Sequence, residues 1–194
     1  MKKILPLIFI VIMAFPSVNA QPEKLGGGVI FSSGYHFQDI NSAGNQSGNL
    51  AISLKHTHKI SMPIEFSPTF SFFFPHVYKD LDMKETVMSL MFEIDFHYIF
   101  NSLDKFEFYG LAGPNLLSAW KTTRYSGNST ASSSERDRAL GLNLGAGSYM
   151  KLTNQFDLYF EAKYVISKHG QFMVSTGILI NIDWLKKHED TGIN

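Results

Sequence analysis

Apolar and polar residues alternate along most of this chain, and this period of two constrains the fold more than any other feature. From residue 64 to residue 72 the even positions are apolar, and the odd positions between them are Glu65, Ser67, Thr69 and Ser71. The same rhythm runs through residues 88–100. Because successive side chains on a strand point to opposite faces, each segment forms a strand with one apolar and one polar face. The pattern predicts long, half-apolar β-strands.

Eight segments of this kind follow one another. They cover residues 25–37, 48–60, 63–74, 86–100, 106–120, 138–152, 156–167 and 171–182. In the fifth segment Gly110, Gly113 and Pro114 blur the alternation and indicate a bulge. We therefore predict an all-β chain that forms an eight-stranded antiparallel up-and-down transmembrane β-barrel.

The breaks between the predicted strands indicate an orientation. Long breaks are expected at Gln38–Ser47, Pro75–Glu85 and Lys121–Asp137, whereas most of the others are short. Outer-membrane barrels combine short periplasmic turns with longer extracellular loops. An even number of strands then places both mature termini in the periplasm.

The first residues are typical of a secretory leader. Lys2 and Lys3 precede the apolar stretch Ile4–Phe15, and Val18-Asn19-Ala20 has the small residues of a cleavage site. The apolar stretch is shorter than the roughly 20 residues that a transmembrane helix needs. We expect a cleavable signal peptide at 1–20, a barrel at 21–182 and a periplasmic tail at 183–194.

Composition excludes several classes of protein. The chain has no cysteine, which rules out a lipid-modified cysteine, a disulfide framework and a thiolate metal site. Without Lys2 and Lys3, 15 basic residues stand against 17 acidic ones, so no excess of positive charge indicates nucleic acid as a partner. After the leader no apolar run is long enough for a transmembrane helix.

Alternation alone fits a membrane barrel or a soluble, lipocalin-like barrel around an apolar cavity. The polar faces are rich in Ser, Thr, Gly and Asn, which suits a crowded interior, and aromatic residues gather near the strand ends, as in interfacial girdles. We therefore expect lipid outside. The predicted lipid-facing residues are Phe66, Phe70, Phe72, Phe92, Ile94, Phe96, Leu142, Leu144, Leu158, Phe160, Ile178 and Ile180.

Several segments resemble a known family. They are Tyr109–Leu116, Leu140–Gly147, Leu158–Tyr164 and Ser175–Ile178, all of them patterns of glycine and aromatic or aliphatic residues. In these the chain resembles the small bacterial outer-membrane β-barrel proteins of the OmpA-transmembrane/OmpX type, and more closely their Bacteroidota relatives. The resemblance implies outer-membrane lipid and the barrel-assembly machinery as partners, and a monomer. Many such barrels end on an aromatic residue used in assembly, whereas this chain continues to Asn194.

The polar face offers candidates for chemistry. The predicted polar network of the lumen consists of Glu65, Glu93, Asp95, His97, Lys151, Glu161 and Lys163. These residues fit either an ion path or a packed network that fills the lumen, and the narrow interior of an eight-stranded barrel favours packing.

Two further groups of residues are candidate sites. His56 and His58 share one strand face and fit either half of a metal site or an interfacial pair. His97, Asp95 and Ser89 share a strand face, as an acyl-transfer enzyme would need. The lipid A deacylases, however, place a serine two positions after a histidine, and no histidine of this chain has a serine at that spacing. We predict no catalytic residue, no cofactor and no metal.

The expected role is structural or surface-interactive, in adhesion or envelope integrity, around a filled polar interior. A narrow channel or small-ligand carrier, a lipid A-modifying enzyme and a soluble periplasmic binder are the alternatives. The polar segment 122–137 is a candidate contact for an extracellular partner.

Overall fold

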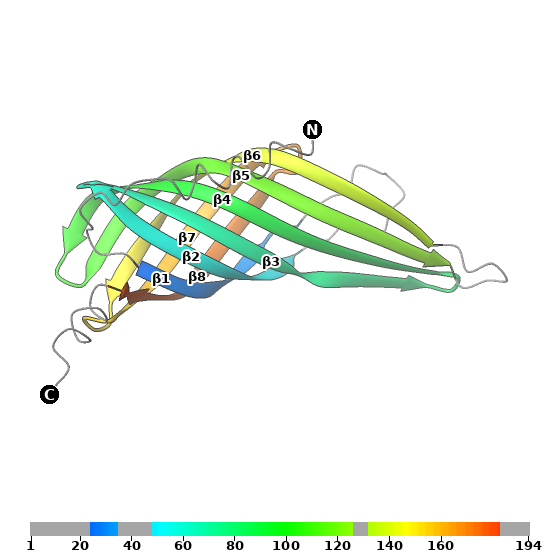
Figure 1. The fold of residues 1–194 in the computed structure, drawn as a ribbon, viewed down its shortest axis with the longest axis horizontal. Coiled ribbons are helices and arrows are strands. Elements are labelled where there is room, and N and C mark those ends of the chain that lie inside the picture. Colours follow the sequence, from blue (N-terminus) through cyan, green and yellow to red (C-terminus); the bar gives the residue numbers. More distant parts are fainter. Residues whose placement is uncertain (1–23, 35–47, 126–131, 183–194) are drawn as a thin grey trace, which may run out of the picture.

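Eight antiparallel strands form a closed barrel, shown in Figure 1. The computed structural model describes residues 24–34, 48–125 and 132–182. The strands are β1 (Lys24–Ser32), β2 (Asn49–Ser61), β3 (Ile64–Asp80), β4 (Met83–Leu103), β5 (Phe106–Tyr125), β6 (Ser132–Lys151), β7 (Phe156–Ser167) and β8 (Gln171–Asn181). Across these residues we find no helix with the length and apolar character to cross a membrane.

Each strand pairs with its neighbours in the chain, and the pairing of β1 with β8 closes the ring. That contact runs from Lys24 opposite Asn181 to Ser32 opposite Met173. The predicted fold class, an all-β up-and-down barrel of eight strands, is confirmed. The predicted leader, the end of the first predicted strand and the C-terminal tail lie outside the described residues.

The bulge predicted in the fifth segment is wrong. The pairing of β5 with β6 runs without a register shift from Phe106 opposite Met150 to Arg124 opposite Ser132. A shift occurs instead on the β4 side, between Ile99 and Asn101. The glycines of β5 are accommodated within a regular strand.

Strands β3 to β6 are longer than predicted, so two of the expected long breaks are wrong. Leu81 and Asp82 alone connect β3 to β4, and β5 and β6 pair as far as Arg124 opposite Ser132. Within 75–85 and 121–137, β-branched and aromatic residues such as Val77, Tyr78 and Thr122 favour an extended chain although the segments are polar overall.

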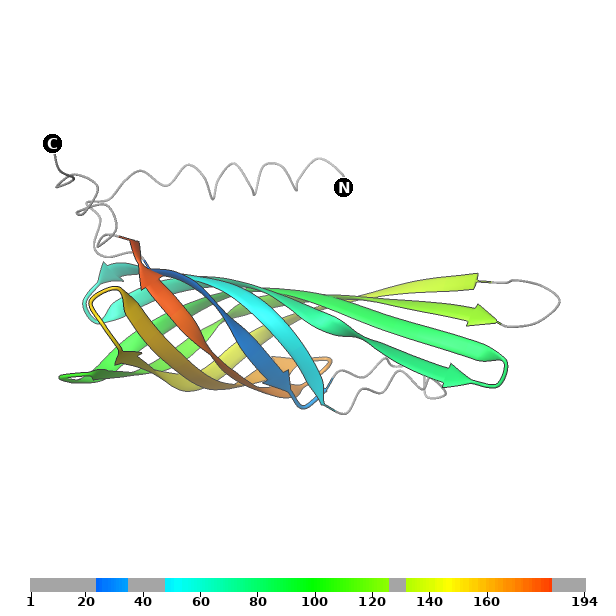
Figure 2. The same ribbon diagram turned by 90° about the horizontal axis from the view of Figure 1, so that it is seen from below.

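The long strands project beyond the ring at the end opposite to the start of β1 and the end of β8, as Figures 1 and 2 show. We call the end of the barrel that holds the start of β1 and the end of β8 the terminal end. The projecting sheet is defined as residues 74–80, 83–88, 118–125 and 132–139. It continues β3 to β6 past the last pairs that these strands make with β2 and β7.

The outside of the ring is apolar. The predicted lipid-facing residues lie on the outer face, where each side chain is exposed or half-buried and their polar neighbours on β3, β4 and β7 point inward. Phe160 is 51% exposed and Leu144 57% exposed. This placement is opposite to that of a soluble barrel, in which the apolar residues would enclose a cavity.

Candidate functional site

A buried group of charged and amide side chains occupies the half of the lumen near the terminal end. Lys163 on β7 is its centre, with Nζ 2.7 Å from Glu93 Oε1 and 3.1 Å from Asp95 Oδ2. Asn143 donates from Nδ2 to both carboxylates, at 2.7 Å and 2.8 Å, and Asn115 donates to Asn143 Oδ1 at 2.5 Å. Charges removed from water need partners of this kind. Strands β4, β5, β6 and β7 are thereby linked through the interior.

A second group surrounds Glu161, also on β7. Its carboxylate is paired with Lys55 from β2 and accepts a hydrogen bond of 2.8 Å from the Tyr109 hydroxyl. Ser175 Oγ on β8 lies 3.3 Å from the other carboxylate oxygen. Glu161 therefore connects one wall of the barrel to the opposite wall across the lumen.

His97 packs between the two groups and the terminal end. Its Nδ1 lies 2.8 Å from the Tyr149 hydroxyl and 3.9 Å from Glu65 Oε2, and its ring stacks on Tyr109 with 4.4 Å between centroids. The His97 side chain is fully buried, as is the Tyr149 side chain. The aromatic rings fill the space between the charged pairs.

Three glycines of the inner face give these side chains room. A Cβ added at Gly147 would lie 2.6 Å from Tyr109 Cζ, one at Gly145 would lie 2.6 Å from Lys163 Cβ, and one at Gly28 would lie 2.2 Å from the hydroxyl of Tyr159. Small residues on the inner face thus leave space for large side chains from neighbouring strands, as in other small barrels.

Buried apolar side chains gather in the other half of the lumen, near the projecting sheet. Its buried cluster comprises Ile30, Ala51, Phe73, Val87, Met91, Leu117, Ala119, Ala139, Val165 and Met173. In this half the interior mixes apolar side chains with buried serines such as Ser71 and Ser89, so the expectation of a polar interior is only partly correct. In this part of the strands both the inner and the outer face carry apolar side chains. The sequence therefore does not alternate there, and alternation was the basis on which the interior residues were predicted.

The predicted lumen residues do not all come together. Glu65, Glu93, Asp95, His97, Glu161 and Lys163 are all buried in the lumen. Lys151 has the inward parity, but it lies at the end of β6, where its side chain is 54% exposed and 3.8 Å from Glu107. It is thus excluded from the network, because the wall of the barrel has ended at that level.

Sequence reasoning missed partners that complete the network: Lys55, Asn115, Asn143, Tyr109 and Tyr149. Alternation within the predicted strand 48–60 places Lys55 on the same face as Ser53 and Thr57, so its direction could have been found. Its contact with Glu161, 106 residues away, depends on the closure of the ring.

The other candidate residues lie apart from the network. His56 and His58 are on the outer face of β2, with stacked rings 6.5 Å apart. Within the described ranges no three His, Asp or Glu side chains are grouped so that they could hold a metal ion. Ser89 and His97 are both buried, but the hydroxyl 2.8 Å from His97 belongs to Tyr149.

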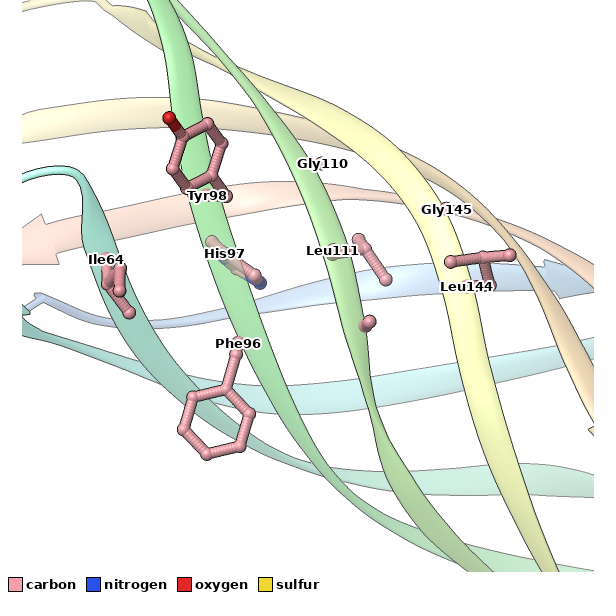
Figure 3. A pocket seen from close by; sticks show the side chains of 9 residues that line it. Ile64, Phe96, His97, Tyr98, Gly110, Leu111, Leu144 and Gly145 are labelled. Carbon is pink, nitrogen blue, oxygen red and sulfur yellow. The ribbon is translucent and has the colours of Figure 1, made fainter.

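A shallow apolar depression of about 410 Å³ lies on the outside of the barrel, as Figure 3 shows. It forms where Gly110 and Ala112 leave a gap between Phe96, Tyr98 and Leu144. His97 contributes to its floor, but the imidazole remains buried. The depression is therefore part of the apolar outer surface and gives no access to the charged network.

Solved structures share this fold. Ail, the attachment invasion locus protein of Yersinia pestis, matches with a TM-score of 0.54 and 13% identity, over 82% of this chain and 95% of that chain. The N-terminal β-barrel domain of Pseudomonas aeruginosa OprF matches with a TM-score of 0.54 and 15% identity, over 84% and 99%. No protein-family model and no curated protein matches the sequence. The chain has the fold of the small outer-membrane β-barrels.

Proposed function

We propose that this protein is a bacterial outer-membrane barrel with a structural or surface-interaction role, and that it is neither a channel nor an enzyme. One observation carries the proposal: an apolar outer surface encloses a lumen filled by paired charges, aromatic rings and an apolar cluster. In a small barrel that spans a bilayer, the outward side chains of each strand must be apolar and the inward side chains must be packed in the lumen.

The projecting sheet supports the surface-interaction part of the proposal. With both termini in the periplasm, the sheet extends outside the cell and offers a rigid platform rather than a loop. Ail, which shares the fold, is named for attachment, and we extend a contact role of this kind to the present chain. A relationship to Bacteroidota barrels is part of the same proposal and rests on the sequence resemblance.

The filled lumen disfavours the channel. Passage would have to cross both the Lys163 and Glu161 groups and the apolar cluster that contains Phe73 and Met91. In a planar bilayer we expect the refolded protein to give no steady current. A sustained single-channel conductance would contradict the packed interior.

Fractionation tests the location. The protein should be recovered in the outer-membrane fraction, and its mobility on a gel should differ between unboiled and boiled samples because a folded barrel resists detergent. Identical mobility together with release into the soluble fraction would overturn the assignment. The acyl pattern of lipid A, measured by mass spectrometry, should be the same with and without the gene.

A further inference from the structure

The outer face of the projecting sheet is basic, whereas acidic residues of the same strands face the other way. Its exposed basic side chains are Lys79, Lys84, Arg124, Arg136 and Arg138. The pairing register assigns the faces. Glu85 and Thr123 form a buried inner pair, so Lys84 and Arg124, one residue further along, pair on the outer face.

The acidic residues nearby have the inner parity. Glu135 pairs in register with Lys121 and lies 3.0 Å from its Nζ, and Asp137 lies 2.7 Å from His169 Nε2. Both contacts are made on the inner side of β6. The outer face of the sheet therefore carries the five basic residues, whereas Glu85, Glu135 and Asp137 face inward together with Lys121.

The basic side chains of the outer face repel one another. Lys79 lies directly opposite Lys84, and Lys84 lies directly opposite Arg124. Like charges placed in this way destabilise a sheet. Within 24–34, 48–125 and 132–182, no carboxylate forms an ion pair with any of the five. This clustering of like charges without carboxylate partners indicates that an anion from outside the chain meets the outer face.

The basic face begins where the apolar outer surface ends. Arg138 lies on the same face of β6 as Leu140, two residues closer to the tip of the projecting sheet. At the usual rise per residue and strand tilt, this separation is about 5 Å along the barrel axis. At the next level Arg136 lies over the ring of Trp120, 5.0 Å from its centroid. Tryptophan is characteristic of the boundary between hydrocarbon and headgroups. Arg136 and Arg138 thus lie at headgroup level.

We propose that the outer face of the projecting sheet binds the phosphate groups of a phosphorylated glycolipid in the surrounding outer leaflet. Arg136 and Arg138 contact the phosphates nearest the hydrocarbon, and Lys79, Lys84 and Arg124 meet anionic groups further from it. Arginine suits this task because its guanidinium can hold two phosphate oxygens at once. The inference rests on the proposed membrane orientation. Continuity with the apolar surface favours a lipid over a soluble polyanion.

The test uses the refolded full chain in neutral detergent, titrated with bisphosphorylated lipid A and followed by native mass spectrometry. The R136Q/R138Q variant should bind roughly 30-fold more weakly, since each basic residue near an anionic surface contributes about a fivefold preference. The K105Q/K151Q variant removes the same charge at the terminal end and should bind like the wild type. Lipid A without phosphates should bind the wild type as weakly as lipid A binds R136Q/R138Q.

Three results would overturn the inference. The first is that R136Q/R138Q binds lipid A as tightly as the wild type, and the second is that K105Q/K151Q loses as much affinity as R136Q/R138Q. The third is that the wild type binds lipid A equally well with and without its phosphates. Tighter binding of a free sulfated oligosaccharide, lost in the same variant, would replace the lipid with a soluble polyanion. Heat-dependent gel mobility reports folding independently. A wild-type protein that shows normal heat-dependent mobility but does not bind lipid A would count only against this inference, whereas absence from the outer membrane would count against the proposed function.

Discussion

Gly147 lies against the ring of Tyr109, so closely that a Cβ at this position would be 2.6 Å from Tyr109 Cζ and 2.8 Å from Glu161 Cγ. The ring has little room to move aside, because it stacks on His97 with 4.4 Å between centroids and packs at a tilt of 32° against Tyr149 with 4.5 Å between centroids. The packing of the lumen therefore depends on the absence of a side chain at one point of β6.

We predict that Gly147→Ala lowers the free energy of unfolding by about 1–3 kcal/mol, the usual cost of overpacking. Gly110→Ala is the matched control. Gly110 also lies in a regular strand, but a Cβ there has no neighbour within 4 Å. Urea unfolding of the refolded barrel in lipid vesicles measures both. Equal losses in the two variants would show that the Tyr109 contact does not limit the site.

Lys163 should be the most sensitive charge of the lumen. Lys163→Met leaves Glu93 and Asp95 buried without their cation, and we expect a loss of about 3–5 kcal/mol. Lys168→Met removes a lysine that pairs with Asp137 at the surface, and about 0–1 kcal/mol is expected there.

Removing the two carboxylates should rescue the Lys163 variant. In the triple variant K163M/E93Q/D95N no unpaired charge remains around Asn143, so part of the lost stability should return. Urea unfolding again provides the measurement. A triple variant that is less stable than K163M would mean that the carboxylates have other essential contacts.

The outer face offers a test of the membrane itself. Leu144 lies on β6 midway between Met150 and Arg138, and Leu140 lies near the projecting sheet. Leu144→Arg should cost about 2–4 kcal/mol in a bilayer and Leu140→Arg about 0–1 kcal/mol, because the penalty depends on depth. The two leucines are 57% and 78% exposed, so in a barrel surrounded by water neither change would cost much. Vesicle unfolding that shows no difference between them would contradict lipid contact at Leu144.

Alternation accounts for the parts of the fold that could be predicted. Where a strand is regular and only one face is apolar, as around Glu93 and Asp95, a period of two is enough to assign each side chain to a face. The identity of contacts is a different matter. Lys163 meets Glu93 and Asp95 across two intervening strands, and their distances in the chain, 70 and 68 residues, give no hint of that contact.

Two features escaped prediction for physical reasons. Phe73, Val87 and Met91 are buried in the lumen although they are apolar, and apolar residues on both faces of a strand remove the alternating signal. The long strands were not predicted because segments 75–85 and 121–137 are polar overall and lack a regular alternation of apolar and polar residues. Polar segments are typical of loops, but cross-strand hydrogen bonding requires only an extended backbone, so a polar segment can also form a strand.

The projecting sheet should therefore behave as structure and not as a loop. Thr122 lies on β5 between Thr86 of β4 and Ser134 of β6. Proline has no backbone N–H and disrupts the centre of a sheet. We predict that the amides of 84–87 and 133–136 exchange slowly with deuterium in the wild type and at least tenfold faster in Thr122→Pro. Amides of the barrel wall near Glu161 should keep their protection in both proteins, which shows that the ring is intact. Fast exchange in the wild-type segments, at the rate of the turn at 168–170, would mean that the four strands do not extend past the ring.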